Sequence, residues 1–340
     1  MILYLGNALS KHGYTPAMME TLAPKLAGKH QLLSYSTKKN QLLRFLDIIL
    51  AVIRHRRVTS LIIIDTFSTL AFWYFVAVAT LCRFFAIPYI PVLRGGDLPA
   101  RVARQSAFLN KSFAYAAVNI SPSAYLKRGF DKLGYKTICI PNFLEMEKYP
   151  FKKRSALQAR LLWVRAIHRI YNPGLAIRLV HALKDLYPDI TLCMVGPDKD
   201  GSLEKMIALA RELNVEEKVR FTGKLSKADW INLSTDFDIF INTTDVDNMP
   251  VSVIEAMALG LPVVSTNVGG VPDLIDPDKD GLLVAKDNLE EFKSAVIQLL
   301  ADPGLGVALS NAARKKAESF SWERVGPLWD EVIRTYQKKN

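Results

Sequence analysis

The sequence contains only three cysteines and no long run of apolar residues. Cys82, Cys139 and Cys193 lie more than fifty residues apart. This spacing supports neither a zinc knuckle nor a disulfide framework and is typical of a reducing compartment. The longest run without a charge, residues 66–82, has 17 residues, fewer than the ~20 apolar residues of a membrane-spanning helix. No basic segment precedes the first apolar residues, so we expect no secretory signal and a cytoplasmic location.

Length and composition predict a globular protein of two domains. With 340 residues, of which 50% are apolar and 23% charged, the chain exceeds one ordinary core and fits two of ~150 residues. Short apolar runs alternate with helical patterns in both halves, as buried parallel sheets require. The predicted strands are residues 2–5, 61–64, 89–93, 118–120, 137–140, 161–164, 191–195, 219–221, 237–241, 262–265 and 282–284.

These patterns predict an α/β protein with two doubly wound Rossmann-like domains. We place the N-terminal domain at residues 1–150, the C-terminal domain at residues 151–320, and a final helix in residues 321–340 that crosses back to the N-terminal domain. Thr15 and Asn172 each precede a proline, a combination typical of a helix start. A further helix is predicted over residues 250–259, closed by Gly260.

Charge is distributed unevenly along the chain. Residues 1–160 hold 23 Lys and Arg against 7 Asp and Glu, whereas residues 161–340 hold 21 against 26. The basic half indicates an anionic partner, and an acidic membrane surface ranks above nucleic acid because no nucleic-acid reader motif accompanies the charge. Residues 38–57 have basic ends and an apolar middle, which fits either a core helix or an interfacial helix on anionic lipid. Residues 67–85 allow the same two interpretations. Together with the basic charge of the first half, these segments lead us to expect peripheral contact with the inner face of a membrane.

Three features of the sequence predict a ligand site where parallel strands end. Arg165 follows the predicted strand 161–164, where a guanidinium can pair with a phosphate, although a surface arginine fits the same position. Gly6 and Gly13 lie in the first strand-to-helix loop and allow close backbone approach, but the loop matches no phosphate-binding motif and can be an ordinary connection. The third feature is residues 243–260.

Residues 243–260 combine acceptors for hydroxyl groups with donors for a phosphate. Asp247 precedes a helix start, and Glu255 lies on that helix among apolar neighbours, where a buried carboxylate needs hydrogen-bond donors. Sugar hydroxyls are suitable donors. The open amides at the helix start favour an anion such as a pyrophosphate. This combination suits a nucleotide-sugar.

The spacing Asp247-x7-Glu255 resembles the E-x7-E signature of family-4 retaining glycosyltransferases, which have the GT-B fold of two Rossmann-like domains facing a cleft. The segment Val195-Gly196-Pro197 resembles the family's VG-G segment. Further segments that resemble family motifs are residues 121–123, 140–142, 220–223, 268–275 and 280–284. The resemblance is strong over residues 118–300 and weaker but collinear before them.

The resemblance implies roles for individual residues. Asp247 contacts the hydroxyls of the donor sugar, Glu255 binds the ribose, and Arg165 neutralises the departing diphosphate without a metal ion. Gly13 lies near the diphosphate, and Arg94 and Asp97 are guessed acceptor contacts. The remaining expected donor contacts are Gly196, the backbone of Asn248, Met249, Pro250 and Val251, and Arg169, which partly replaces a family lysine. The chain is thus expected to move a hexose from a nucleotide-sugar to a lipid-linked or glycan acceptor.

The sequence departs from the family pattern at three positions. The family lysine five residues after Arg165 is Ile170, the first glutamate is the shorter Asp247, and the frequent histidine after the second predicted strand is replaced around Asp65. These departures leave two alternatives open, a nucleotide-sugar epimerase and a non-catalytic binding or scaffold protein. His168 alone is weak evidence for the catalytic base of an epimerase. Two D-x-D patterns, at residues 236–238 and 245–247, are more typical of acidic residues in loops than of a metal site.

Overall fold

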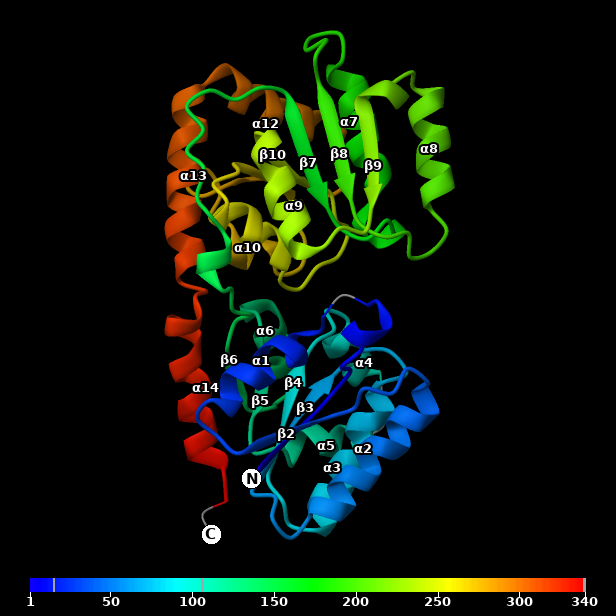
Figure 1. Cartoon of the computed structure of the whole chain (residues 1–340), viewed down its shortest axis with the longest axis vertical. Coiled ribbons are helices and arrows are strands. Elements are labelled where there is room, and N and C mark those ends of the chain that lie inside the picture. Colours follow the sequence, from blue (N-terminus) through cyan, green and yellow to red (C-terminus); the bar gives the residue numbers. More distant parts are fainter. Residues whose placement is uncertain (15, 105–106, 339–340) are drawn as a thin grey trace. The chain divides into compact units, whose positions relative to one another are not determined.

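The computed structural model describes residues 1–14, 16–104 and 107–338 and divides into two compact units. The first comprises Met1–Asn142 and Glu323–Asn340, and the second comprises Phe143–Trp322. Residues 143–150, assigned from the sequence to the first domain, thus belong to the second unit, because Leu144 and Tyr149 are buried in its core. Figure 1 shows the helices and strands of the chain.

The first unit contains a six-stranded parallel sheet in the order β2-β1-β3-β4-β5-β6. Its strands are β1 (Ile2–Leu5), β2 (Leu32–Tyr35), β3 (Leu61–Thr66), β4 (Tyr89–Leu93), β5 (Asn119–Ser121) and β6 (Thr137–Cys139). The sequence predicts all of them except β2. That strand lies at the sheet edge and mixes exposed with half-buried residues, so it lacks a continuous apolar run.

The helices of the first unit are α1 (Met18–Ala27), α2 (Gln41–His55), α3 (Phe72–Phe84), α4 (Leu98–Ala103), α5 (Ala107–Ala114), α6 (Ala124–Lys132) and α14 (Trp322–Tyr336), with the 3-10 turn η1 (Ser10–His12). Thr15, the predicted helix cap, lies outside the described residues. Helix α1 begins at Met18, where the Glu20 carboxylate accepts a hydrogen bond from the backbone N–H of Ala17 at 2.9 Å. The C-terminal helix α14 is tied to the unit through Asp330, which receives Lys29 Nζ at 2.6 Å.

The second unit contains another six-stranded parallel sheet, in the order β12-β11-β10-β7-β8-β9. Its strands are β7 (Arg160–Val164), β8 (Thr191–Val195), β9 (Val219–Gly223), β10 (Ile239–Asn242), β11 (Val263–Thr266) and β12 (Leu282–Val284), all at predicted positions. Alternate residues of β7 enter different cores, Leu161 and Trp163 on one face and Leu162 on the other. Both faces of this sheet are therefore covered, as its continuous apolar strands predict.

The α-helices of the second unit are α7 (Pro173–Leu183), α8 (Leu203–Glu212), α9 (Lys227–Leu233), α10 (Val251–Ala258), α11 (Val271–Leu274), α12 (Leu289–Ala301) and α13 (Pro303–Glu318). Its 3-10 turns are η2 (Met146–Lys148), η3 (Arg169–Tyr171), η4 (Glu216–Lys218) and η5 (Ser234–Asp236). The Asn172 side chain caps α7 by accepting from the N–H of Leu175 at 3.3 Å, as the Asn-Pro pair predicts.

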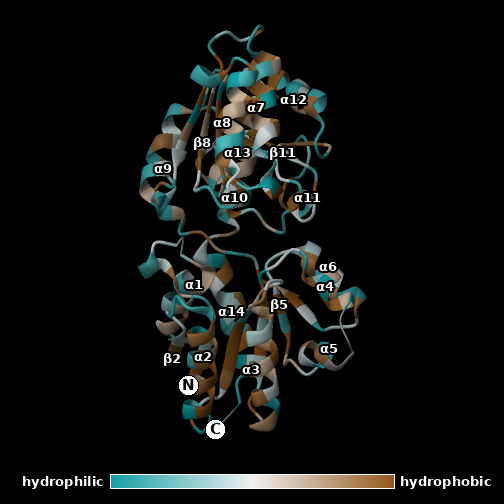
Figure 2. Ribbon diagram, turned by 90° about the vertical axis from the view of Figure 1, so that its right-hand side faces the viewer, coloured by the Kyte–Doolittle hydropathy of each residue, from teal (hydrophilic) through white to brown (hydrophobic). Residues whose placement is uncertain are grey.

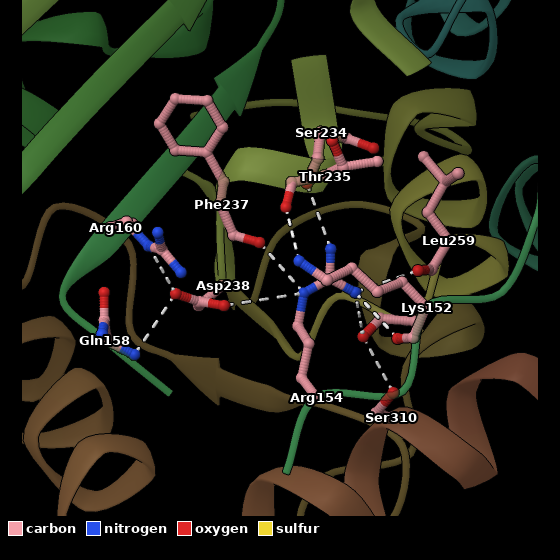
Figure 3. Close-up of polar contacts among 11 residues, drawn as sticks. Lys152, Arg154, Gln158, Arg160, Ser234, Thr235, Phe237, Asp238, Leu259 and Ser310 are labelled. Carbon is pink, nitrogen blue, oxygen red and sulfur yellow. Dashed lines mark hydrogen bonds and ion pairs between the residues drawn. The ribbon is translucent and has the colours of Figure 1, made fainter. Parts of the chain in front are cut away.

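A buried arginine connects distant segments of the second unit (Figure 3). Arg154 is 4% exposed and lies 3.9 Å from Asp238, while Asp238 also accepts from Arg160 Nε at 2.8 Å. Burial lowers the pKa of Arg154 to about 10, against the opposing effect of Asp238. The guanidinium donates to the carbonyl oxygens of Lys152, Ser234, Phe237, Leu259 and Gly260. Asp238, part of one D-x-D pattern, is thus a structural acid.

Within the described ranges, no single helix is both long enough and apolar enough to cross a membrane, and only α12 with α13, bent by 103°, reach the required length and composition as a pair.

Candidate functional site

The candidate site lies in the second unit, at the carboxyl ends of two neighbouring strands. Arg165 follows β7 directly, and Asp247 lies in the loop after β10, which pairs with β7. Nη2 of Arg165 donates to Oδ2 of Asp247 in a close ion pair. Their side chains are 15% and 12% exposed, so the pair is largely shielded from water while remaining reachable. The structure brings together the two residues predicted to be catalytic.

The guanidinium of Arg165 is held by its surroundings. Its Cζ lies 4.9 Å from the centre of the Tyr171 ring, a cation–π contact that orients the flat group. The backbone is fixed as well, because the N–H of Arg165 donates to the carbonyl of Val195 at 3.0 Å. Nε of Arg165 is buried and has no hydrogen-bond partner among the described residues. This arginine therefore retains an unused donor beside its ion pair.

Gly196 is required by the position of Arg165. A Cβ at residue 196 would lie 1.7 Å from the carbonyl oxygen of Arg165, far inside any real contact. The close approach of two strand ends thus explains the glycine, and the expected contact of Gly196 with the donor stays a prediction.

The loop around Asp247 is held by short backbone contacts. Oδ1 of Asp247 accepts from the N–H of Asn248 at 2.8 Å, and its carbonyl accepts from the N–H of Gly270 at 3.0 Å. Gly269, at φ +55°, would place a Cβ 2.0 Å from that carbonyl. The segment 268–270 therefore supports the loop that carries Asp247, which gives this family-like motif a local structural role.

Helix α10 begins directly after the loop. Pro250 caps the helix and has no N–H, and the N–H of Asn248 is already bonded to Asp247, so not all of the predicted backbone donors are open. Met249 and Val251 are half-buried at the helix start. Ser252, which is not among the predicted site residues, has a buried Oγ without a partner among the described residues. An unpaired hydroxyl beside open helix amides is suited to a ligand oxygen.

Glu255 faces into the unit from α10 and is only 3% exposed. Its Oε1 accepts from the hydroxyl of Tyr149 at 2.7 Å and also contacts Nζ of Lys227. Burial and the Glu255 carboxylate raise the pKa of Tyr149 well above its ordinary value, so the hydroxyl stays a donor. The prediction that the buried Glu255 carboxylate needs hydrogen-bond donors is confirmed. Two of these donors, Tyr149 and Lys227, belong to the protein itself. Neither Tyr149 nor Lys227 belongs to a motif that marks it in the sequence.

The residues around Ile170, which stands in place of the family lysine, make contacts within the protein. Arg169 is exposed at the start of η3, and Ile170 is 37% exposed, with its carbonyl accepting from the N–H of Asp245 at 2.8 Å. The Asn172 side chain donates to Asp287 at 3.0 Å. Nε2 of His168 lies 3.9 Å from Asp200. In the described part of the chain, no group of three or more His, Cys, Asp or Glu side chains gathers as metal ligands would.

The remaining predicted residues lie in the first unit. Arg94 belongs to a buried network in which its Nε donates to Asp65 at 2.9 Å and its Nη1 to Asn142 at 3.1 Å. Nε and Nη1 of Arg94 are therefore already bonded within the unit, whereas a guanidinium that binds an acceptor substrate needs open donors. Asp97 is exposed and pairs with Arg104 at 3.5 Å, and Gly13 ends η1 at φ +82°. Their expected ligand contacts stay predictions.

Comparison with known proteins places this geometry in a family. The model of the family "Glycosyl transferases group 1" matches residues 146–316. A D-inositol 3-phosphate glycosyltransferase of Corynebacterium jeikeium is 30% identical over 166 residues, which are 47% of this chain and 40% of that protein. The chain spans about half the length of the curated relatives it matches, from 34% to 57%.

Two solved structures share the fold over nearly the whole chain. HepE of Anabaena, in complex with UDP-glucose, has a TM-score of 0.79 at 16% identity and covers 98% of this chain and 99% of its own. Sucrose-phosphate synthase from Thermosynechococcus elongatus has a TM-score of 0.81 at 16% identity, covering 98% of both chains. The family match includes Arg165, Asp247 and Glu255 and extends over half of the sequence, and the chain therefore belongs to the group 1 glycosyl transferases and has the GT-B fold.

Proposed function

We propose that the protein transfers a hexose from a nucleoside-diphosphate sugar to an acceptor hydroxyl and retains the configuration at the anomeric carbon. The observation that carries this proposal is the Arg165–Asp247 pair beside the start of α10, with Glu255 buried one helix turn further. A cation, a sugar-binding acid and a ribose-binding acid thus share one edge of one sheet. Retention is inferred from the family resemblance.

The proposed chemistry begins with exchange of partners at Arg165. The donor diphosphate takes the guanidinium from Asp247, whose carboxylate then accepts hydrogen bonds from sugar hydroxyls. The bond between the anomeric carbon and the diphosphate oxygen breaks, and the acceptor oxygen bonds to that carbon while its proton passes to the leaving phosphate. Arg165 stabilises the charge that develops on the diphosphate, a task that accounts for a large share of catalysis in such sites.

Glu255 is proposed to hold the ribose. Tyr149 and Lys227 both contact Oε1, so the ribose hydroxyls are assigned to Oε2. The two protein donors fix the carboxylate in a single orientation before the ligand arrives, which reduces the ordering required on binding.

The acceptor and location are part of the same proposal. The first half of the chain is strongly basic, which suits an acceptor that carries phosphate or is linked to a lipid or a surface glycan. A cytoplasmic location is supported by the small number and wide spacing of the cysteines.

A donor screen and a turnover assay test the proposal. The screen measures the thermal shift with UDP-, GDP-, ADP- and TDP-sugars, beginning with UDP-glucose, and the turnover assay follows diphosphate release with candidate acceptors. We expect one donor class to stabilise the wild type and Arg165→Ala to lower kcat by about 10²–10³. Arg178→Ala, which removes an arginine that pairs with Asp287 at 3.5 Å, is the matched control and should leave kcat unchanged.

Two outcomes would favour the alternatives. An isomerised donor without diphosphate release would identify an epimerase. Donor binding without turnover under every acceptor condition would identify a binding protein.

A further inference from the structure

Helix α2 buries Ile48 and Val52 but turns several leucines outward and Arg44 inward. Leu43, Leu46 and Leu50 lie three or four residues apart on the outer face, and Leu50 is 63% exposed. Arg44 is 5% exposed and faces inward, where Nη1 donates to the carbonyl of Lys38 at 2.8 Å. A helix on the surface of a water-soluble domain normally has the opposite arrangement, because burial of leucine is favourable and burial of arginine is not.

Helix α3 extends this apolar surface. The hydroxyl of Tyr74 donates to the carbonyl of Gln41 at 2.8 Å, and the Phe45 and Tyr74 rings lie 5.6 Å apart, so α2 and α3 are neighbours (Figure 1). Much of both helices is apolar in sequence (Figure 2). We call the exposed apolar set the α2–α3 face. It consists of Leu42, Leu43, Leu46, Leu50, Ile53, Val58, Leu70, Trp73 and Phe84.

The exposed side chains of this face include large aromatic ones. Trp73 is 48% exposed and Phe84 is 80% exposed. Large apolar side chains gathered on two adjacent helices are unusual on a surface that meets only water, whereas single exposed residues are common. The face therefore needs a partner.

The rim of the face is basic. Lys38 and Lys39 are exposed just before α2, and the exposed cations at the other end of the two helices are Arg54, Arg56, Arg57 and Arg83. Arg56 lies 5.7 Å from the centre of the Phe85 ring, which places a cation from the end of α2 beside the end of α3. Over residues 38–84 the acids are only Asp47, which is half-buried, and Asp65, which is buried.

We propose that the α2–α3 face docks on a lipid bilayer that contains anionic lipids. The leucines and Trp73 enter the boundary between headgroups and acyl chains, and the rim cations contact the lipid phosphates. A second copy of the chain is a poorer occupant, because pairing this face with itself would bring two basic rims together. Nucleic acid would use the cations but leave the leucines exposed to water. The face lies wholly in the first unit, so the proposal is independent of the donor site.

Vesicle sedimentation with the full chain tests the proposal. Wild type is mixed with vesicles of phosphatidylcholine alone and with vesicles of phosphatidylcholine and phosphatidylglycerol in equal parts. We expect preferential binding to the anionic vesicles, reduced by added salt. The double variant Leu46→Glu/Leu50→Glu should weaken that binding by about tenfold or more. Leu186→Glu, which changes an equally exposed leucine of the second unit, is the control and should bind like wild type.

Two further measurements separate docking from other effects. Leu46→Gln/Leu50→Gln adds no charge and should still weaken binding, and circular dichroism verifies that each variant folds. Anionic vesicles should shift the tryptophan emission to the blue, and Trp73→Phe should remove most of that shift. Equal binding to neutral and anionic vesicles, unchanged binding of both double variants, or a wild-type dimer that Leu46→Glu/Leu50→Glu dissociates would overturn the proposal.

Discussion

Arg165 and Asp247 are separated by 82 residues in the chain and form a close ion pair at the ends of two adjacent strands. Because Nη2 of Arg165 donates to Oδ2 of Asp247, the carboxylate occupies a position on the guanidinium that the phosphate of a donor would take. The diphosphate of a donor must therefore displace Asp247 from the guanidinium. Only then can the Asp247 carboxylate accept hydrogen bonds from the hydroxyls of the sugar.

This competition predicts opposite effects on binding and turnover. Asp247→Asn removes the competing charge, so the best-bound nucleoside diphosphate should bind about tenfold more tightly, equivalent to ~1.4 kcal/mol. Turnover of the corresponding sugar donor should fall, because the amide is a weaker acceptor for its hydroxyls. Calorimetry gives the affinity and diphosphate release gives kcat. Asp245→Asn, in the same loop, is the control, and weaker diphosphate binding by Asp247→Asn would contradict competition.

Tyr149 should orient Glu255 for the nucleotide. Tyr149→Phe removes the donor 2.7 Å from Oε1 and keeps the ring, leaving Lys227 as the remaining contact. A hydrogen bond to a charged group contributes about 1.5–3 kcal/mol, so we expect roughly tenfold weaker nucleotide binding and a lower free energy of unfolding. Tyr187→Phe, on the other core of the unit, controls for the loss of a hydroxyl. If both variants bound nucleotide equally well, Tyr149 would have no orienting role.

The same tyrosine predicts a dependence of stability on alkaline pH. Burial and the nearby carboxylate raise the pKa of Tyr149 above its ordinary value of 10.0 in the folded state, so the hydroxyl ionises first in the unfolded chain. Its contribution is therefore fully present below pH 10.0 and is lost above it, by about 1.4 kcal/mol per pH unit. Tyr4, whose pKa burial and Asp65 also raise, acts in the same direction in the first unit.

Urea unfolding on both sides of pH 10.0 measures this effect. Tyr149→Phe should lose less stability than wild type over the first pH unit above that value, by about 1 kcal/mol. Parallel losses in the two proteins would show that Tyr149 does not contribute to the alkaline transition.

Much of the second sheet could be predicted from the sequence because its strands are buried on both faces and read as short apolar runs. The proximity of Arg165 and Asp247 follows from the same logic, since carboxyl ends of neighbouring parallel strands meet at one edge. Glu255 could be predicted to need donors, but their identity could not. Tyr149 lies 106 residues from Glu255, and no periodicity relates the two.

The first unit shows the limits of pattern reasoning more clearly. The sequence of α2 identifies a helix without telling which of its apolar residues are buried. Only the fold shows that Ile48 and Val52 enter the core and that Leu46 and Leu50 do not. Arg94 illustrates the same point, because its burial depends on Asp65 and Asn142, which lie on other segments.

Gly196 provides a test of how strictly the backbone positions Arg165. In Gly196→Ala the new methyl group would overlap the Arg165 carbonyl at 1.7 Å, so the strand end must move and carry the guanidinium with it. We expect a clear drop in both the melting temperature and kcat. Gly201→Ala is a useful comparison because residue 201 has a positive φ of +77° but no atom within 4 Å of the added group. It should lose some stability through strain and keep its kcat, and equal loss of kcat in the two variants would remove the special role of Gly196.

Arg154 should stabilise the second unit through the carbonyls that it joins. Arg154→Leu would leave a set of buried carbonyl oxygens without a donor and Asp238 with one cation fewer, a loss of about 3–5 kcal/mol by analogy with broken buried ion pairs. Arg154→Lys keeps the charge but cannot reproduce the planar fork, so it should recover only part of the loss.

Because the chain has two units, amide hydrogen exchange in β10 and α10 reports the change better than a single melting temperature. We expect faster exchange there in Arg154→Leu and unchanged exchange in β3. Full recovery of protection by Arg154→Lys would mean that charge alone, and not the set of five carbonyl contacts, accounts for the stability.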